Sequence, residues 1–164
     1  MIVAVGHGDL TDATLKLMEV ELRDRLERLD DGAASLVRAG AGLPVAFGRA
    51  VRAAGRRLLV LLPTQHSVPA QLPGRDREGA RELLLLAEEV RLAAFDPADR
   101  EACIGADERL VRASSTVLAV WDGSPSDGRD ATAHLVAHAR AHGVPVEVLW
   151  PEGAARTRRI TTGA

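Results

Sequence analysis

The sequence predicts an α/β domain in which a mostly parallel sheet of five to six strands lies between two layers of helices. Short apolar runs of strand length alternate with longer segments in which apolar residues recur at helical spacing. The short runs are apolar at nearly every position, which is typical of strands covered on both faces. With 164 residues and no internal repeat or linker, the chain fits a single domain around one core.

Residues that start or stop helices divide the chain into these elements. Thr11 or Asp12 can cap the first helix, because a side-chain oxygen there accepts from a free backbone N–H. Pro44 suits the first turn of the second helix, and Gly55 ends that helix. Strands are expected at 2–5, 34–37, 57–62, 92–95, 116–121 and 145–150, and helices at about 12–29, 44–54, 76–90, 98–114 and 131–142.

Composition excludes several classes of protein. The net charge is −2 and the pI is near 6.2, so the whole chain has no electrostatic bias toward nucleic acid. Cys103 is the only cysteine, which rules out an internal disulfide and indicates an inert thiol on an apolar helix face. No apolar run approaches the roughly 18–20 residues that span a bilayer, and the first residues do not resemble a signal peptide. We therefore expect a cytoplasmic protein with no membrane partner.

The polar segment from residue 122 to 132 predicts where a ligand would bind. It follows the apolar strand 116–121 and precedes the helix that leads to the strand 145–150. Open parallel sheets bind ligands at the carboxyl ends of their strands, because loops and helix N-termini with unpaired N–H groups converge there. We expect the domain to comprise residues 1–151, with a flexible basic tail over residues 152–164 that frays.

Two further loops at the same edge contain glycines. Gly6, His7 and Gly8 precede one helix, and Gly40 and Gly42 precede the next. Backbone N–H groups in such loops can approach a phosphate closely, although tight turns that need glycine explain them equally well. Two such turns side by side favour a phosphate or ribose site.

Several polar side chains near this edge could act on a ligand. Asp122 and Asp127 could accept hydrogen bonds from ribose hydroxyls, and Arg129 could meet a phosphate. Asp130 or Thr132 could instead cap the following helix. His7 and His66 both fall in loops and could titrate near neutral pH or serve only as polar loop residues.

His134, His138 and His142 recur every four residues and would form a ladder along one helix face. Metal ligands can follow this spacing, but the apolar positions of the helix point elsewhere and no carboxylate lies at a matching offset. An exposed histidine stripe is the preferred interpretation, and no metal ligand set or resident cofactor is predicted.

Taken together, these motifs resemble the SLOG superfamily of Rossmann-like nucleotide-binding proteins, which includes the LOG phosphoribohydrolases and DNA-processing protein A. The similar segments span nearly the whole chain: Val5-Gly6-His7-Gly8-Asp9-Leu10, Arg38-Ala39-Gly40-Ala41-Gly42, Val117-Leu118-Ala119-Val120-Trp121-Asp122-Gly123, Ala131-Thr132 and Val144-Pro145-Val146. The resemblance implies a nucleotide or nucleotide derivative as ligand and a homodimer formed through the last helices. The implied ligand-binding residues are Gly6, His7, Gly8, Gly40, Gly42, Trp121, Asp122, Gly123, Gly128, Arg129 and Thr132.

The chain departs from the enzymes of this superfamily at the position that matters for catalysis. Aligning Thr132 with the threonine of the LOG motif places Leu135 where those enzymes carry a catalytic glutamate. A leucine can neither protonate a leaving base nor stabilise an oxocarbenium ion, so a non-catalytic, sensor-like binding module is the leading prediction. Two alternatives remain, a nucleotide N-glycosidase and an interaction protein whose pocket has degenerated. An enzyme would need another carboxylate, and the candidates are Asp9, Asp107, Glu108 and Asp122.

Overall fold

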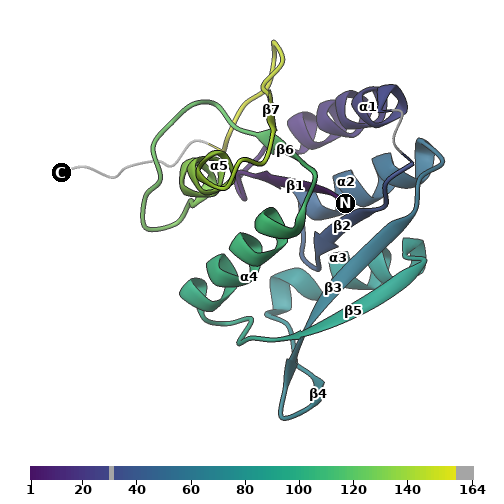
Figure 1. Ribbon diagram of the computed structural model, residues 1–164, viewed down its shortest axis with the longest axis vertical. Helices are drawn as coiled ribbons and strands as arrows, with labels where there is room; N and C mark the ends of the chain where they lie inside the picture. The colour runs from purple at the N-terminus through teal and green to yellow at the C-terminus, as the bar shows by residue number, and fades with distance from the viewer. Residues whose placement is uncertain (30–31, 158–164) are drawn as a thin grey trace.

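The computed structural model describes residues 1–29 and 32–157, in which strands and helices alternate as the sequence predicts (Figure 1). The elements are β1 (Ile2–Gly6), α1 (Asp12–Arg28), β2 (Ser35–Arg38), α2 (Leu43–Ala53), β3 (Leu58–Gln65), β4 (Val68–Pro69), α3 (Gly74–Leu86), β5 (Glu89–Ala94), α4 (Arg100–Ala113), β6 (Thr116–Val120), α5 (Thr132–Ala141) and β7 (Val146–Leu149). The predicted α/β class and parallel sheet are confirmed.

The order of the strands fixes where loops can gather. The parallel strands follow the order β5-β3-β2-β1-β6-β7, and the short β4 pairs antiparallel with the end of β3. From β1 the chain builds outward through β2, β3 and β5, and then returns to the other side of β1 with β6. The order therefore reverses between β1 and β6, and the loops after these two strands flank a crevice at the carboxyl edge.

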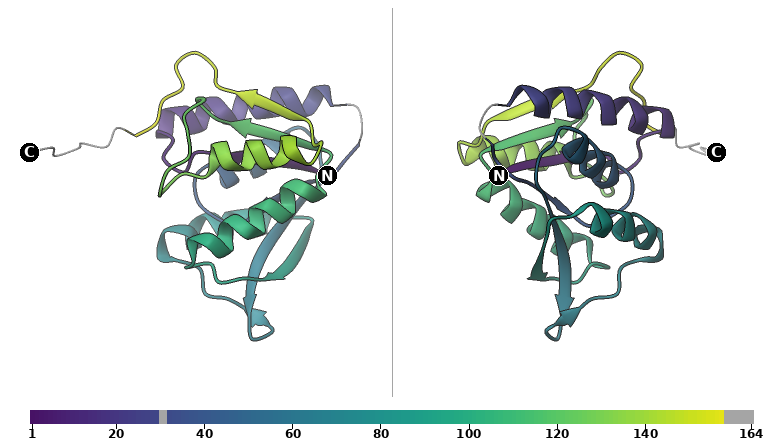
Figure 2. Two further views of the ribbon diagram at one scale, coloured as in Figure 1. Left: turned by 60° about the vertical axis from the view of Figure 1, so that its left-hand side comes forward. Right: turned by 90° about the vertical axis from the view of Figure 1, so that its right-hand side faces the viewer.

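Helices cover both faces of the sheet (Figure 2), and alternate strand residues pack in two separate cores beneath them. Ile2 of β1 packs with α1, α2 and α3 on one face, where Met18 and Phe47 are fully buried. The next residue, Val3, packs with α4 and α5 on the other face, where Val111 and Val136 are buried. This alternation explains why the strands are apolar at nearly every position.

The structure differs from the prediction between residues 63 and 94. The segment expected to be a loop extends β3 to Gln65 and turns back through β4, with His66 and Ser67 at positive φ in the turn. The next helix ends at Leu86 rather than near residue 90, and β5 begins at Glu89. The apolar run at residues 83–87 has neither helical nor strand periodicity, so the sequence pattern could not place the end of the helix.

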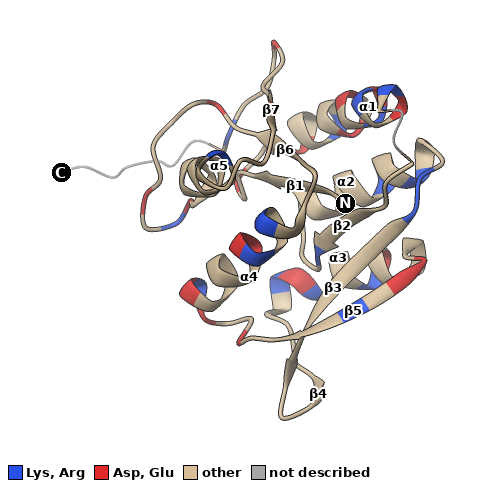
Figure 3. Cartoon of the chain, viewed as in Figure 1, with Lys and Arg blue, Asp and Glu red and all other residues tan. Residues whose placement is uncertain are grey.

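The described surface mixes charges of both signs and carries scattered apolar side chains. Basic and acidic residues are interleaved along α1 and α4 (Figure 3). The exposed large apolar residues of the described chain lie outside α4 and α5: Val20, Val68, Leu84, Leu85, Val90, Leu92 and Val148. A homodimer through the last helices stays a prediction. Among the described residues, no helix combines the length and the apolar character that a membrane span requires.

Gly6 and Gly8 offer a matched pair for testing why glycine stands in the first loop. A Cβ on Gly6 would lie 2.5 Å from Leu43 Cδ2 and 2.8 Å from the Val120 carbonyl oxygen, whereas a Cβ on Gly8 would meet nothing within 4 Å. We expect Gly6→Ala to lower the free energy of unfolding by about 1–3 kcal/mol through overpacking, and Gly8→Ala to change it by less than about 0.5 kcal/mol. Urea unfolding measures both, and equal effects would contradict a packing role for Gly6.

Candidate functional site

The crevice between β1 and β6 holds a cluster of polar side chains from three parts of the chain. His7 and Asp9 follow β1, and Asp122 and Asp130 lie at the two ends of the loop after β6. Arg156 comes from the segment that follows β7. The cluster therefore lies at the edge of the sheet where the sequence predicts a ligand. Of its five residues, His7 and Asp122 belong to the predicted ligand-binding set.

His7 is the buried centre of the cluster, with 1% of its surface exposed. Its Nδ1 lies 2.6 Å from Asp130 Oδ2, and because an ionised carboxylate only accepts, this nitrogen carries a proton. Nε2 lies 3.1 Å from both the backbone N–H and the Oδ1 of Asp122. A neutral ring accepts from that N–H, whereas a protonated ring donates to Oδ1. Trp150 contacts the ring edge-on, with the ring centroids 5.7 Å apart.

Carboxylates of the chain occupy the backbone N–H groups that a phosphate would use. Asp130 Oδ1 accepts from the N–H of Thr132 at the start of α5, at 2.9 Å. Asp122 Oδ1 accepts from the N–H of Ser124 at 2.9 Å. Asp127 Oδ1 accepts from the backbone N–H groups of Arg129 and Asp130. The loop after β6 is thus capped by its own acidic residues.

These hydrogen bonds keep the two aspartates at the loop ends ionised. Burial opposes the charge of Asp122, but hydrogen bonds from Ser124 and the charges of His7 and Arg156 lower its pKa to about 2. Burial also opposes the charge of Asp130, and its hydrogen bonds from His7 and Thr132 hold its pKa well below the usual range. Two carboxylates therefore stay negative beside one imidazole.

Arg156 supplies the opposing charge. Its Nε lies 2.8 Å from Asp9 Oδ1, its Nη2 lies 3.2 Å from Asp130 Oδ2, and its Nη1 lies 3.5 Å from Asp122 Oδ2. Nη1 also donates to the Ser124 hydroxyl at 3.1 Å. Hydrogen bonds to Asp9, opposed by burial, raise the pKa of the guanidinium, so one cation serves three carboxylates.

The segment around Arg156, which belongs to the basic tail expected from residue 152, makes backbone hydrogen bonds to the first loop and to α1. The N–H of Thr157 donates to the Asp9 carbonyl at 2.6 Å, and the N–H of Thr11 donates to the Ala155 carbonyl at 3.2 Å. The Ala155 N–H also donates to the Thr14 hydroxyl at 2.8 Å. We call residues 154–157 the strap. Residues 158–164 of the predicted tail lie outside the described residues.

A metal ion would compete with the strap for the same oxygens. His7, Asp9 and Asp130 each offer a ligand atom within 4.8 Å of the others, the one such group of three found in the described chain. Arg156 already pairs with both carboxylates of this group. The guanidinium therefore takes the position that a cation would occupy.

The second glycine loop is also closed by a carboxylate. Gly42 precedes α2 with φ at 78°, a conformation that favours glycine, and the N–H of Ala41 donates to Asp76 Oδ1 at 3.2 Å. At the end of β2, Arg38 makes two hydrogen bonds to Asp107, at 2.7 and 3.0 Å. Burial works against the charge of Arg38, yet attraction and hydrogen bonding from Asp107 raise its pKa. Asp107 is thus committed to this ion pair.

Several other predicted residues lie apart from the cluster or point away from it. Trp121 donates to the Ser124 carbonyl at 2.8 Å and packs on the core beneath α4 and α5, so it is not placed to stack on a base. His66 is in the β3–β4 turn. Leu135 is buried in the core beneath α4 and α5.

Three further predicted residues lie in the loop after β6, and Cys103 lies on α4. Gly123 turns the chain at positive φ, and Gly128 and Arg129 are exposed in the same loop. Cys103 is half-buried rather than in the core, and burial raises the pKa of its thiol, consistent with an unreactive side chain. Sequence reasoning missed Arg156 and Trp150, since nothing local marks a residue beyond the last strand as part of a site.

Comparison with known proteins identifies the fold. No family model and no curated protein sequence matches the chain. The structure is similar to that of the molybdenum cofactor carrier protein of Chlamydomonas reinhardtii, with a TM-score of 0.55, 18% identity, and coverage of 90% of this chain and 74% of that one. An uncharacterised protein from Agrobacterium tumefaciens matches at a TM-score of 0.24 and 14% identity over 90% of this chain and 61% of its own, too weak to inform the fold.

The depressed pKa values of Asp122 and Asp130 predict how stability depends on pH. A group whose folded pKa lies below its ordinary value, 3.8 here, stabilises the fold above that value and loses the contribution as the pH falls through the folded pKa. We expect the free energy of unfolding to fall between about pH 4 and about pH 2. Asp122→Asn should make the decline shallower. Urea unfolding at several pH values measures both slopes, and identical slopes would contradict this role for Asp122.

Proposed function

We propose that this protein is a non-catalytic binding module for a small nucleotide-like molecule, which binds in the crevice between β1 and β6. The observation that carries the proposal is the convergence of three carboxylates, Asp9, Asp122 and Asp130, on the single side chain of Arg156. Arg156 belongs to the strap rather than to the sheet, so its place can be taken without unfolding the domain. Carboxylates in such a position accept hydrogen bonds from hydroxyl and N–H donors.

The chemistry of Arg156 indicates what could replace it. Its guanidinium presents a planar fork of N–H donors to the carboxylates. A ribose diol, or a base edge with an amino group beside a ring N–H, presents donors of the same kind. A ligand that carries both would satisfy the carboxylates when the strap moves away.

Phosphate groups contribute less in this proposal. The N–H groups of Ala41, Ser124 and Thr132 already donate to aspartates, and a phosphate would have to displace these carboxylates. Gly8 and Arg129 are exposed in the loops after β1 and β6, and they are the groups we assign to phosphate contact. Most of the affinity should then come from the nucleoside part of the ligand.

Three observations support binding over turnover. Leu135 is 6% exposed within the core, so the position that carries a glutamate in LOG enzymes offers no acid or base here. Asp122, with a pKa of about 2, holds no proton to donate near neutral pH. The similar fold of a protein described as a molybdenum cofactor carrier supports a role in holding a molecule rather than converting it.

A ligand screen on wild type and Arg156→Ala tests the proposal. The probes are nucleoside monophosphates, their free nucleosides and nicotinamide dinucleotides, followed by thermal shift and product analysis. Because Arg156→Ala releases three carboxylates, we expect it to bind the best probe at least fivefold more tightly than wild type. Arg156→Gln, which keeps an amide donor, should be intermediate, and the probe should be recovered intact.

Three results would contradict the proposal. Weaker binding by Arg156→Ala would make Arg156 an anion-binding residue instead of a stand-in for the ligand. Release of a free base would establish an N-glycosidase. Binding by neither protein to any probe would favour a degenerate pocket.

A further inference from the structure

The strand β5 forms one edge of the sheet, and its outer side is open (Figure 1). It pairs with β3 along its whole length, and no strand of the described chain pairs with its other side. Ala93 is partly buried, whereas the other residues of the strand are exposed. An edge of this kind leaves backbone N–H and C=O groups free to pair with the strand of another chain.

Val90 and Leu92 make one face of this strand apolar. Their partners in β3 are Val60 and Leu62, which pack in or against the core beneath α1, α2 and α3. Residues paired across neighbouring strands lie on the same face of the sheet, so Val90 and Leu92 point to that side. They are nevertheless 42% and 58% exposed. The helices therefore leave apolar surface uncovered beside the free backbone edge.

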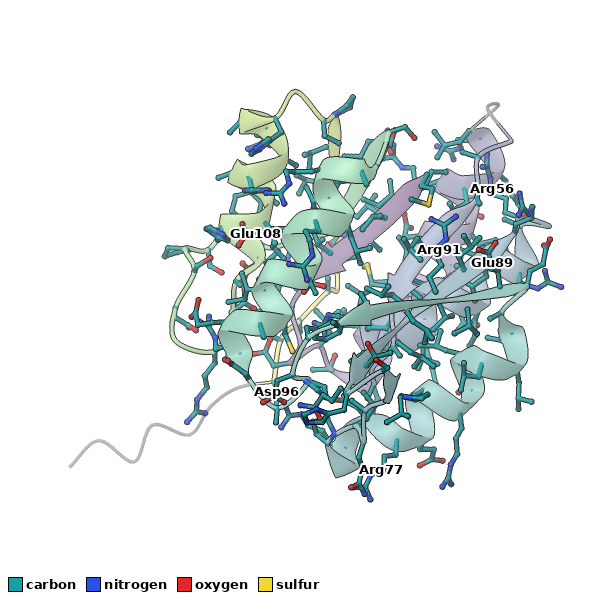
Figure 4. The ribbon with its side chains drawn as sticks, turned by 60° about the horizontal axis from the view of Figure 1, so that its bottom comes forward. Arg56, Arg77, Glu89, Arg91, Asp96 and Glu108 are labelled. Atoms are coloured by element: carbon teal, nitrogen blue, oxygen red, sulfur yellow. The ribbon has the colours of Figure 1, made fainter. Side chains whose placement is uncertain are left out.

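The other face of β5 carries one basic and one acidic side chain, Arg91 and Glu89 (Figure 4). Arg91 Nε lies 3.3 Å from Glu89 Oε1, and the two side chains are 45% and 47% exposed. Charges of one sign along an edge strand would repel a second copy of the same strand. A pair of opposite charges instead matches the same pair on a copy that runs in the other direction.

The alternation of the backbone restricts how two copies of β5 can pair. Successive residues direct their N–H and C=O groups to opposite sides of the strand, so the two-fold axis of an antiparallel pair passes through a residue. An axis through Val90 sets Glu89 of each copy opposite Arg91 of the other. An axis through Glu89 or through Arg91 would set that side chain opposite its own copy, and like charges directly opposite each other are destabilising.

The last helices are less suited to self-association. The exposed large apolar side chains of the described chain lie outside α4 and α5. Between these helices, Glu108 Oε1 lies 3.4 Å from His134 Nε2, and Oε2 lies 3.7 Å from His138 Nδ1. The side chain of His138 is only 13% exposed, so part of the predicted exposed stripe packs against α4. These polar groups are thus engaged within one chain.

We propose that two copies of this chain associate by antiparallel pairing of β5 with β5, about a two-fold axis at Val90. The sheet then continues from one copy into the other. Val90 and Leu92 of both copies meet on one face, and Glu89 and Arg91 alternate on the other. This surface differs from the last helices, through which the resemblance implies a dimer. The strands β3 and β2 separate it from the crevice, so the pairing does not depend on the proposed ligand.

Sedimentation equilibrium over a range of protein concentrations tests this pairing. We expect wild type to dimerise reversibly in the micromolar range, because a short edge buries less than the roughly 800 Å² per partner of a standard interface. Glu89→Arg and Arg91→Glu each place like charges opposite each other, and each should weaken dimerisation at least tenfold. An equimolar mixture of the two variants should restore it, because every opposed pair then combines an acid with a base.

Arg140→Glu is the matched control, because Arg140 is an exposed arginine on α5. We expect this variant to dimerise as wild type does, and loss of its dimer would place the interface on the last helices instead. The proposal would also be overturned by a wild type that stays monomeric at about 1 mM, by single β5 variants that dimerise normally, or by a mixture that stays monomeric. Circular dichroism of every variant confirms that the fold is retained.

Discussion

The organisation of the crevice depends on the buried contact between His7 and Asp130. A carboxylate that is 7% exposed has lost most of its hydration, and the 2.6 Å hydrogen bond from His7 and the ion pair with Arg156 compensate for that loss. The contact joins the loop after β1 to the start of α5, and so fixes the two walls of the crevice relative to each other. The strap is stabilised by the same charge.

This constraint also changes the chemistry expected at the edge of the sheet. Rossmann-like sites commonly present free N–H groups and a helix N-terminus to a phosphate. Here α1 is capped by Thr11, and the N–H of Thr132 at the start of α5 donates to Asp130. The crevice therefore presents acceptors, and the guanidinium of Arg156 lies over them as a donor. The ligand that we propose would match these acceptors with the hydroxyl and amino groups of a nucleoside.

Features that depend on local sequence patterns could be predicted from the sequence. The apolar strands β1 and β6, the cap at Thr11 and the position of the crevice followed from periodicity and breakers. The hairpin at His66 was not predicted, because residues 63–70 are polar and contain prolines, a composition typical of loops. The start of β5 was missed because the apolar run before Glu88 has no period that separates helix from strand. The contacts of Arg156 and Glu108 join residues distant in sequence, as Arg156 and Asp9 are 147 positions apart. Only the folded chain brings such pairs together.

The central claim is that a ligand and Arg156 compete for the same three carboxylates. The most direct measurement is the nuclear magnetic resonance signal of the Arg156 Nε–H, which donates to Asp9 at 2.8 Å in this structure. The spectrum would be followed while the nucleoside or nucleotide with the largest thermal shift is titrated into wild-type protein. The account predicts that this signal loses its protection from exchange and moves to the position of an exposed arginine as the protein saturates. Saturation with the signal unchanged would contradict it.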